Sequence, residues 1–89
     1  MPTIYLTSHL RRVAPSGPTR VEAATLGAAL DAYFETAPKV RSYIVDDQGR
    51  LRKHVAVFID GELLIDKKDL DRGVAPNSEI YVMQALSGG

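Results

Sequence analysis

Residues 53–65, KHVAVFIDGELLI, decide the fold. Side chains in 53–59 alternate with a period of two, which is typical of a β-strand with one buried face. Asp60-Gly61 is a tight-turn dipeptide, so residues 62–65 are expected to return as a short strand. The sequence therefore predicts a central β-hairpin. The residues of its first strand divide between two faces: Val55, Val57 and Ile59 on one, and His54, Ala56 and Phe58 on the other.

The segment that follows the hairpin is polar and ends in another strand. Residues 66–78 read as a loop in which Leu70 and Val74 contact the core. Residues 79–85, EIYVMQA, again alternate and predict the last strand. Ile80 and Val82 are expected to face the core, and Tyr81 and Met83 to face the opposite side.

The N-terminal part predicts a second hairpin. Residues 3–7 are rich in β-forming side chains, and Ile4 and Leu6 share one face. Residues 14–18, APSGP, mark a turn, and residues 19–24, TRVEAA, read as the returning strand.

One long helix is predicted between the two hairpins. Thr25 is a suitable N-cap for residues 26–37, and Pro38 ends the helix because proline disfavours a helical residue before it. Apolar side chains recur at the spacing of one buried helix face. They are Leu26, Ala29, Leu30, Tyr33 and Phe34.

Residues 39–47 indicate a second short helical turn, with Val40 and either Tyr43 or Ile44 packing inward. The predicted order is strand, strand, helix, strand, short strand, strand. One main helix on a mixed sheet of four or five strands is an α+β architecture.

Composition narrows the class of protein. The 89 residues make one domain, and 45% hydrophobic with 25% charged residues argues against disorder. Lys plus Arg and Asp plus Glu number eleven each, so the basic excess of a nucleic-acid binder is missing. The absence of cysteine excludes disulfides, thiolate metal sites and a Cys nucleophile. His9 and His54 have no metal-site spacing. No segment is long and apolar enough to span a membrane, and a cytoplasmic protein is expected.

Three stretches of the sequence resemble a known family. They are ATLGAALDAYFETAP (24–38), LRKHVAVFIDGELL (51–64) and LDRGVAPNSEIYVMQALSGG (70–89), the last ending in Gly88-Gly89. Together they are similar to the ubiquitin-like β-grasp sulfur carriers of the ThiS/MoaD type, and most of all to CysO and related MoaD-like proteins. Ser87 stands where many members have alanine. The resemblance implies a β-grasp domain over residues 1–85 and a flexible diglycine tail over 86–89.

The resemblance also implies a function without catalysis by this chain. An E1-like adenylyltransferase of the ThiF/MoeB type would adenylate Gly89 with ATP, and the chain itself would bind no cofactor. A sulfur donor or sulfurtransferase would then form a thiocarboxylate, and a sulfur-accepting synthase would use it for cysteine, molybdopterin, thiamin or a related metabolite. Leu86, Ser87 and Gly88 would be read by the activating enzyme, because glycine lets a tail enter a narrow channel. No nucleic acid or membrane partner is expected.

Two other functions fit the same pattern. The tail could form an isopeptide bond through Gly89, as in ubiquitin-like protein modifiers, or the domain could be a non-covalent interaction module with an idle tail.

Two surface features have both a functional and an ordinary interpretation. Phe58, Tyr81 and Met83 are predicted on the sheet face away from the helix, where they suggest a partner surface or are simply half-buried. The second feature is a basic cluster made of Arg50, Arg52, Lys53 and His54. Its ordinary interpretation is a charged strand edge that discourages aggregation, and this is preferred over the functional one, docking on an acidic groove.

Overall fold

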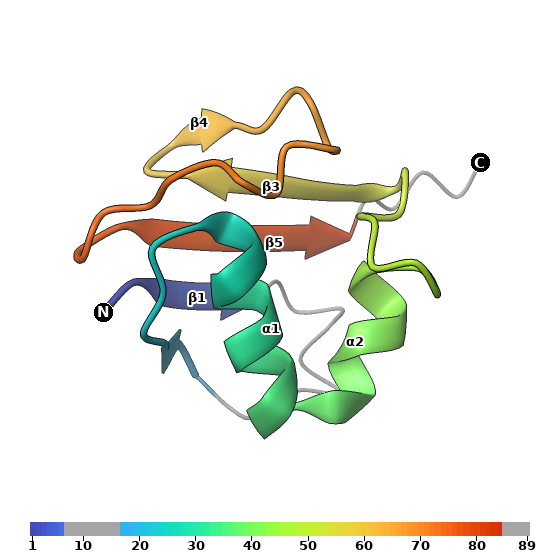
Figure 1. Cartoon of the computed structure of the whole chain (residues 1–89), viewed down its shortest axis with the longest axis horizontal. Helices are drawn as coiled ribbons and strands as arrows, with labels where there is room; N and C mark the ends of the chain where they lie inside the picture. The colour runs from blue at the N-terminus through green and yellow to red at the C-terminus, as the bar shows by residue number, and fades with distance from the viewer. Residues whose placement is uncertain (7–16, 85–89) are drawn as a thin grey trace.

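The computed structural model describes residues 1–6 and 17–84. Five strands form one mixed sheet in the order β2-β1-β5-β3-β4. The central neighbours β1 and β5 run parallel, and the other pairs are antiparallel. Both helices cover the same side of the sheet (Figure 1). The elements are β1 (Thr3–Leu6), β2 (Thr19–Arg20), α1 (Leu26–Thr36), α2 (Pro38–Ile44), β3 (Val55–Ile59), β4 (Glu62–Leu63) and β5 (Glu79–Gln84).

The helix boundaries follow the predicted signals. The Thr25 side chain caps α1 by accepting a hydrogen bond from the N–H of Ala28 at 3.2 Å. Ala37 ends α1, and Pro38 is the first residue of α2. The predicted helical turn is therefore a complete second helix. Its inward residues are Val40 and Ile44, which leaves Tyr43 exposed.

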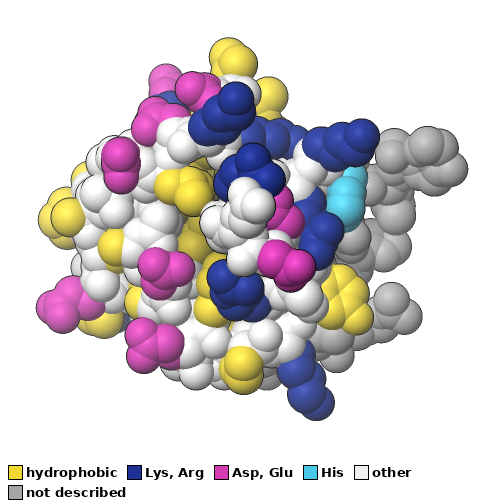
Figure 2. Space-filling view, turned by 45° about the vertical axis from the view of Figure 1, so that its right-hand side comes forward, with side chains coloured by type: hydrophobic (Ala, Val, Ile, Leu, Met, Phe, Trp, Pro, Cys, Tyr) yellow, Lys and Arg dark blue, Asp and Glu magenta, His cyan; other side chains and the backbone are white. Residues whose placement is uncertain are grey.

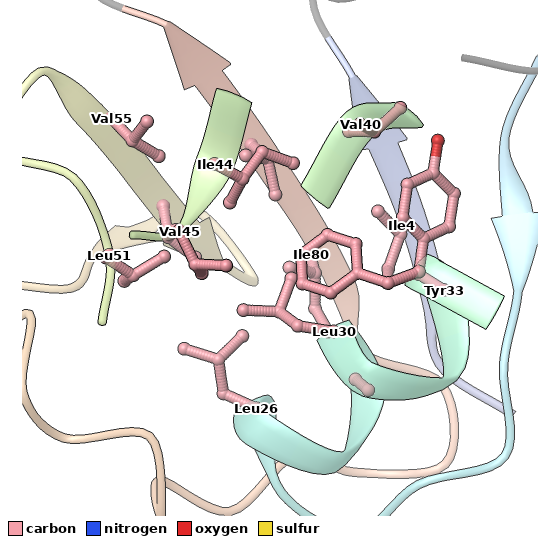
Figure 3. Packing of buried hydrophobic residues seen from close by; sticks show 14 of the residues in the cluster. Ile4, Leu26, Leu30, Tyr33, Val40, Ile44, Val45, Leu51, Val55 and Ile80 are labelled. Carbon is pink, nitrogen blue, oxygen red and sulfur yellow. The ribbon is translucent and has the colours of Figure 1, made fainter. Parts of the chain in front are cut away.

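One hydrophobic core fills the space between the helices and the sheet. Figure 3 shows Tyr33 of α1 beside Ile4 of β1 and Leu30 of α1 near Ile80 of β5, the two central strands. The predicted α1 face is buried in full, and Leu70 and Val74 pack against the core from the loop, as expected. Every core-facing strand residue predicted for β3 and β5 is also buried, namely Val55, Val57, Ile59, Ile80 and Val82.

Three strands are shorter than predicted. β2 covers two residues instead of 19–24, because Val21 turns into the core while its N–H bonds the Pro2 carbonyl at 2.9 Å. β3 begins at Val55 rather than Lys53, since the Val55 N–H closes a turn onto the Arg52 carbonyl at 3.0 Å. β4 likewise has only two of the predicted four residues, after which buried Leu64 leads the chain out of the sheet.

The turn between β3 and β4 holds the register of the central strands. Asp60 and Gly61 have φ values of 51° and 87°, the left-handed pair that suits a two-residue hairpin turn. The Asp60 carboxylate accepts hydrogen bonds from the Glu79 N–H and the Ser78 hydroxyl, both at 2.9 Å. The start of β5 is therefore fixed against the end of β3.

Candidate functional site

The face of the sheet opposite the helices carries a row of apolar side chains. Tyr5 of β1 is directly opposite Tyr81 of β5, Tyr81 is opposite Phe58 of β3, and Phe58 is opposite Leu63 of β4. These four residues form the open-face row, which crosses four adjacent strands. Tyr81 is 40% exposed and Leu63 48% exposed, while Tyr5 and Phe58 are half-buried. Met83, 39% exposed, pairs with Ala56 one step further along.

Two of the aromatic rings stack on each other. The ring centroids of Tyr5 and Tyr81 are 4.5 Å apart, with only 8° between the planes. The Tyr5 hydroxyl donates to the Glu79 carboxylate at a long 3.4 Å. Partial burial raises the pKa of Tyr5, and the negative charge of Glu79, neighbouring Tyr81 and the hydrogen bond to Glu79 act in the same direction. The phenol thus stays neutral, and the stack presents a rigid aromatic surface.

This arrangement suits recognition better than catalysis. Side chains of the open-face row offer large apolar contact area with hydroxyl groups only on the tyrosines, a composition enriched at the centres of protein interfaces. Within residues 1–6 and 17–84, no three His, Asp or Glu side chains gather in a way that could hold a metal ion. The helices of that same part are too short or too polar to cross a membrane.

The three side chains predicted as a partner surface lie on one sheet face, and two more apolar side chains share that face with them. Phe58, Tyr81 and Met83 do share the face away from the helices. Tyr5 was not singled out, although its position between the core-facing residues Ile4 and Leu6 predicts this face. Leu63 could be found only with the hairpin register. The tail residues Leu86, Ser87, Gly88 and Gly89, and also His9, lie outside the described residues.

The strand-edge explanation for the basic cluster stays a prediction. β4 pairs only with Phe58 and Ile59, so within the described residues the start of β3, next to the cluster, has a strand neighbour on one side only. The members also differ in surroundings. Arg50 forms an ion pair with Asp46 at 3.4 Å, whereas the Arg52 Nε donates to the Ser42 carbonyl at 2.8 Å.

Comparison with known proteins places the chain in a family. No family model matches it. It is 33% identical over 87 residues to small archaeal modifier protein 1 of Haloferax volcanii, and 94% of this chain and 95% of the relative are covered. The crystal structure of that protein superposes with a TM-score of 0.85 and 32% identity, covering 99% of this chain and 98% of the other.

Two further structures share the fold at lower identity. A chain of the Amycolatopsis orientalis BexX/CysO complex gives a TM-score of 0.87 at 17% identity, with complete coverage of both chains. CysO of Mycobacterium tuberculosis gives 0.83 at 17% identity, covering 97% of this chain and all of the other. The chain thus has the expected β-grasp fold of the ThiS/MoaD and CysO type, and it belongs to the ubiquitin-like family of small archaeal modifier protein 1.

Proposed function

We propose that the protein is a cytoplasmic sulfur carrier whose Gly89 carboxylate is activated by an E1-like enzyme. The observation that supports this proposal is the family membership over nearly the whole chain, in a sequence whose Gly88-Gly89 pair follows the central strand β5 after only a short segment. Ile80 and Val82 anchor β5 in the core. An enzyme that binds the domain would therefore also position the point where the tail begins.

The proposed chemistry proceeds in two steps. A Gly89 carboxylate oxygen attacks the α-phosphorus of ATP, and the bond to the departing pyrophosphate breaks. Sulfur at the oxidation level of hydrosulfide then attacks the carbonyl carbon of the acyl adenylate, and AMP leaves with its oxygen. The product is a thiocarboxylate, whose sulfur an accepting synthase would take. The partner enzymes supply the catalytic groups of both steps.

The open-face row provides a docking surface for these partners. The sheet that carries Tyr5, Phe58, Leu63 and Tyr81 is packed on its other face, so the backbone under the row need not be ordered on binding. A protein partner is also supported by a fold relative, the CysO of Amycolatopsis orientalis, which was crystallised in a complex with BexX.

The test is reconstitution followed by intact-protein mass spectrometry. The protein is incubated with ATP, an activating enzyme of the ThiF/MoeB type from its own source and a sulfide donor. We expect a mass gain equal to the difference between sulfur and oxygen, located at Gly89. The matched control lacks Gly88 and Gly89 and should stay unchanged. An unmodified full-length protein would contradict the proposal.

A second candidate function is conjugation to other proteins through Gly89. It is favoured by the relative of 33% identity, which is named a modifier protein. The same activated carboxyl would then be attacked by a lysine amine instead of sulfur, giving an isopeptide bond. Adducts of higher mass that survive thiol reductant would support it. A non-covalent interaction module would instead keep its function after deletion of the two glycines.

A further inference from the structure

Basic residues 52–54 lie at the end of the sheet where β5, the last strand, finishes. Val55, the first residue of β3, pairs with Gln84, the last residue of β5. Arg52, Lys53 and His54 immediately precede Val55 in the sequence, so they lie at the same end of the sheet as the last residue of β5. Lys67 joins them, because its Nζ donates to the Lys53 carbonyl. We call Arg52, Lys53, His54 and Lys67 the basic collar.

The positive charges of Arg52, Lys53 and Lys67 are not neutralised within the described part of the chain. The two ion pairs among residues 1–6 and 17–84 are Arg50–Asp46 and Arg72–Glu62, and neither includes a collar residue. Both hydrogen bonds of collar side chains, from Arg52 to Ser42 and from Lys67 to Lys53, end on uncharged carbonyls. These bonds position the side chains and leave the charge available to a partner.

The two ends of the sheet differ in charge although the whole chain is neutral. Asp60, Glu62 and Glu79 lie at the end where β3 finishes and β5 begins, opposite the collar, and of these three Glu62 is paired with Arg72. Figure 2 shows the Lys, Arg and His side chains mostly in its centre and right-hand half, with some Asp and Glu side chains between them and the other Asp and Glu side chains over the left. Such segregation orients a protein during approach to a charged partner.

The collar also adjoins the proposed docking surface. Ala56 and Met83 pair one step from the Val55–Gln84 pair, so the apolar surface leads directly to the collar. A partner covering both would bury apolar contacts at its centre and meet cations at its rim, the usual arrangement of protein interfaces.

We propose that the basic collar docks on an acidic surface of the activating enzyme, beside the opening that receives the C-terminal residues. The inference rests on the proposed function and adds to it the charge of the partner. Rim charges act mainly on the association rate and are screened by salt. Their contribution should therefore appear in the KM for this protein at low ionic strength and fade as salt is added.

The test compares two charge reversals of equal net effect. Lys53→Glu inverts a collar cation, and Arg20→Glu inverts an exposed arginine on β2, the edge strand that β1 and β5 separate from β3. ATP–pyrophosphate exchange is measured with the activating enzyme at low and high salt. At low salt we expect Lys53→Glu to lower kcat/KM about tenfold through KM for this protein, with Arg20→Glu close to wild type. At high salt the two variants should converge.

The possible outcomes separate this inference from the proposed function. Exchange with the wild type but equal values for both variants would overturn the collar inference alone. A change in KM for ATP instead of KM for this protein would also overturn it, because the collar would then be contacting nucleotide phosphate. Absence of any exchange with the wild type would overturn the proposed function and the collar inference with it.

Discussion

The two faces of the sheet are built from alternate residues of the same strands, yet they differ in what covers them. On the helix side, Ile4, Val57, Ile80 and Val82 are at most 1% exposed. On the other side, Tyr81, Met83 and Leu63 keep between 39% and 48% of their surface exposed. Both sets are apolar, so hydrophobicity alone does not distinguish them. The difference shows which residues stabilise the fold and which are available to a partner.

The largest effect is expected from truncating the covered face. Ile80→Ala should lower the free energy of unfolding by about 2–5 kcal/mol, because it leaves a cavity between the sheet and α1. Met83→Ala on the same strand is the control and should cost much less, since its side chain is already partly in water. Urea unfolding followed by circular dichroism measures both, and equal losses would contradict the division between the faces.

A charge on the open face should affect activation more than stability. Phe58→Asp places a carboxylate in the middle of the open-face row, and we expect kcat/KM for adenylation to fall about 30-fold, the scale of an interface hot spot. Tyr43→Asp is the control, since Tyr43 is an exposed aromatic residue on α2. Both variants should retain their circular dichroism spectra. Normal adenylation of a folded Phe58→Asp protein would rule out the row as a docking surface.

The same comparison explains what the sequence could and could not predict. Alternation in 55–59 and 80–83 assigned every residue to its face, because a period of two needs no knowledge of the partner strand. The row itself depends on register. The pair of Tyr5 with Tyr81 arises from a contact between distant segments, which no local pattern contains. The pair of Phe58 with Leu63 is local, because the two-residue turn at Asp60-Gly61 fixes the register of that hairpin.

Element lengths were predicted less well for a related reason. Residues 21–24 were predicted as strand, but Glu22, Ala23 and Ala24 are residue types depleted in strands. Val21 is buried in the core, and the chain must then reach the cap at Thr25. The position of the collar was likewise hidden, because it depends on the pairing of Val55 with Gln84.

A smaller loss of stability is expected at the contact between helix α1 and the loop that contains Leu70. The Gly27 N–H donates to the Leu70 carbonyl at 2.8 Å, and an added Cβ would lie 3.0 Å from that same oxygen. Gly27→Ala should strain this contact by about 1–3 kcal/mol and regain about 1 kcal/mol of helix propensity, for a net loss of about 1 kcal/mol.

The matched control for this substitution is Gly73→Ala. Its Cβ would meet nothing closer than the Ala24 carbonyl at 3.9 Å, so stability should stay unchanged or rise slightly. Thermal unfolding of the two variants is the measurement. A Gly27→Ala protein as stable as the wild type would show that the loop at Leu70 yields without cost.

The smallest effect on stability is expected at the turn that fixes the register of β3 and β5. Hydrogen bonds from the Glu79 N–H and then the Ser78 hydroxyl hold the pKa of Asp60 below its usual value. A carboxyl with a lowered folded pKa stabilises the fold above its unfolded pKa, and this contribution is lost as pH falls through the folded value. Asp60→Asn keeps a residue that tolerates the left-handed turn but removes the charge.

Wild type should therefore be modestly more stable than Asp60→Asn at neutral pH, and the two should converge in acid below the ordinary aspartate pKa of about 4. Asp47→Asn, at an exposed position in the 46–49 turn, is the control and should track the wild type throughout. Urea unfolding at a series of pH values measures the difference. If the stability difference between wild type and Asp60→Asn persists unchanged in acid, the Asp60 charge does not contribute to stability. The register, which keeps each side chain on its own face of the sheet, would then be set by the turn without that charge.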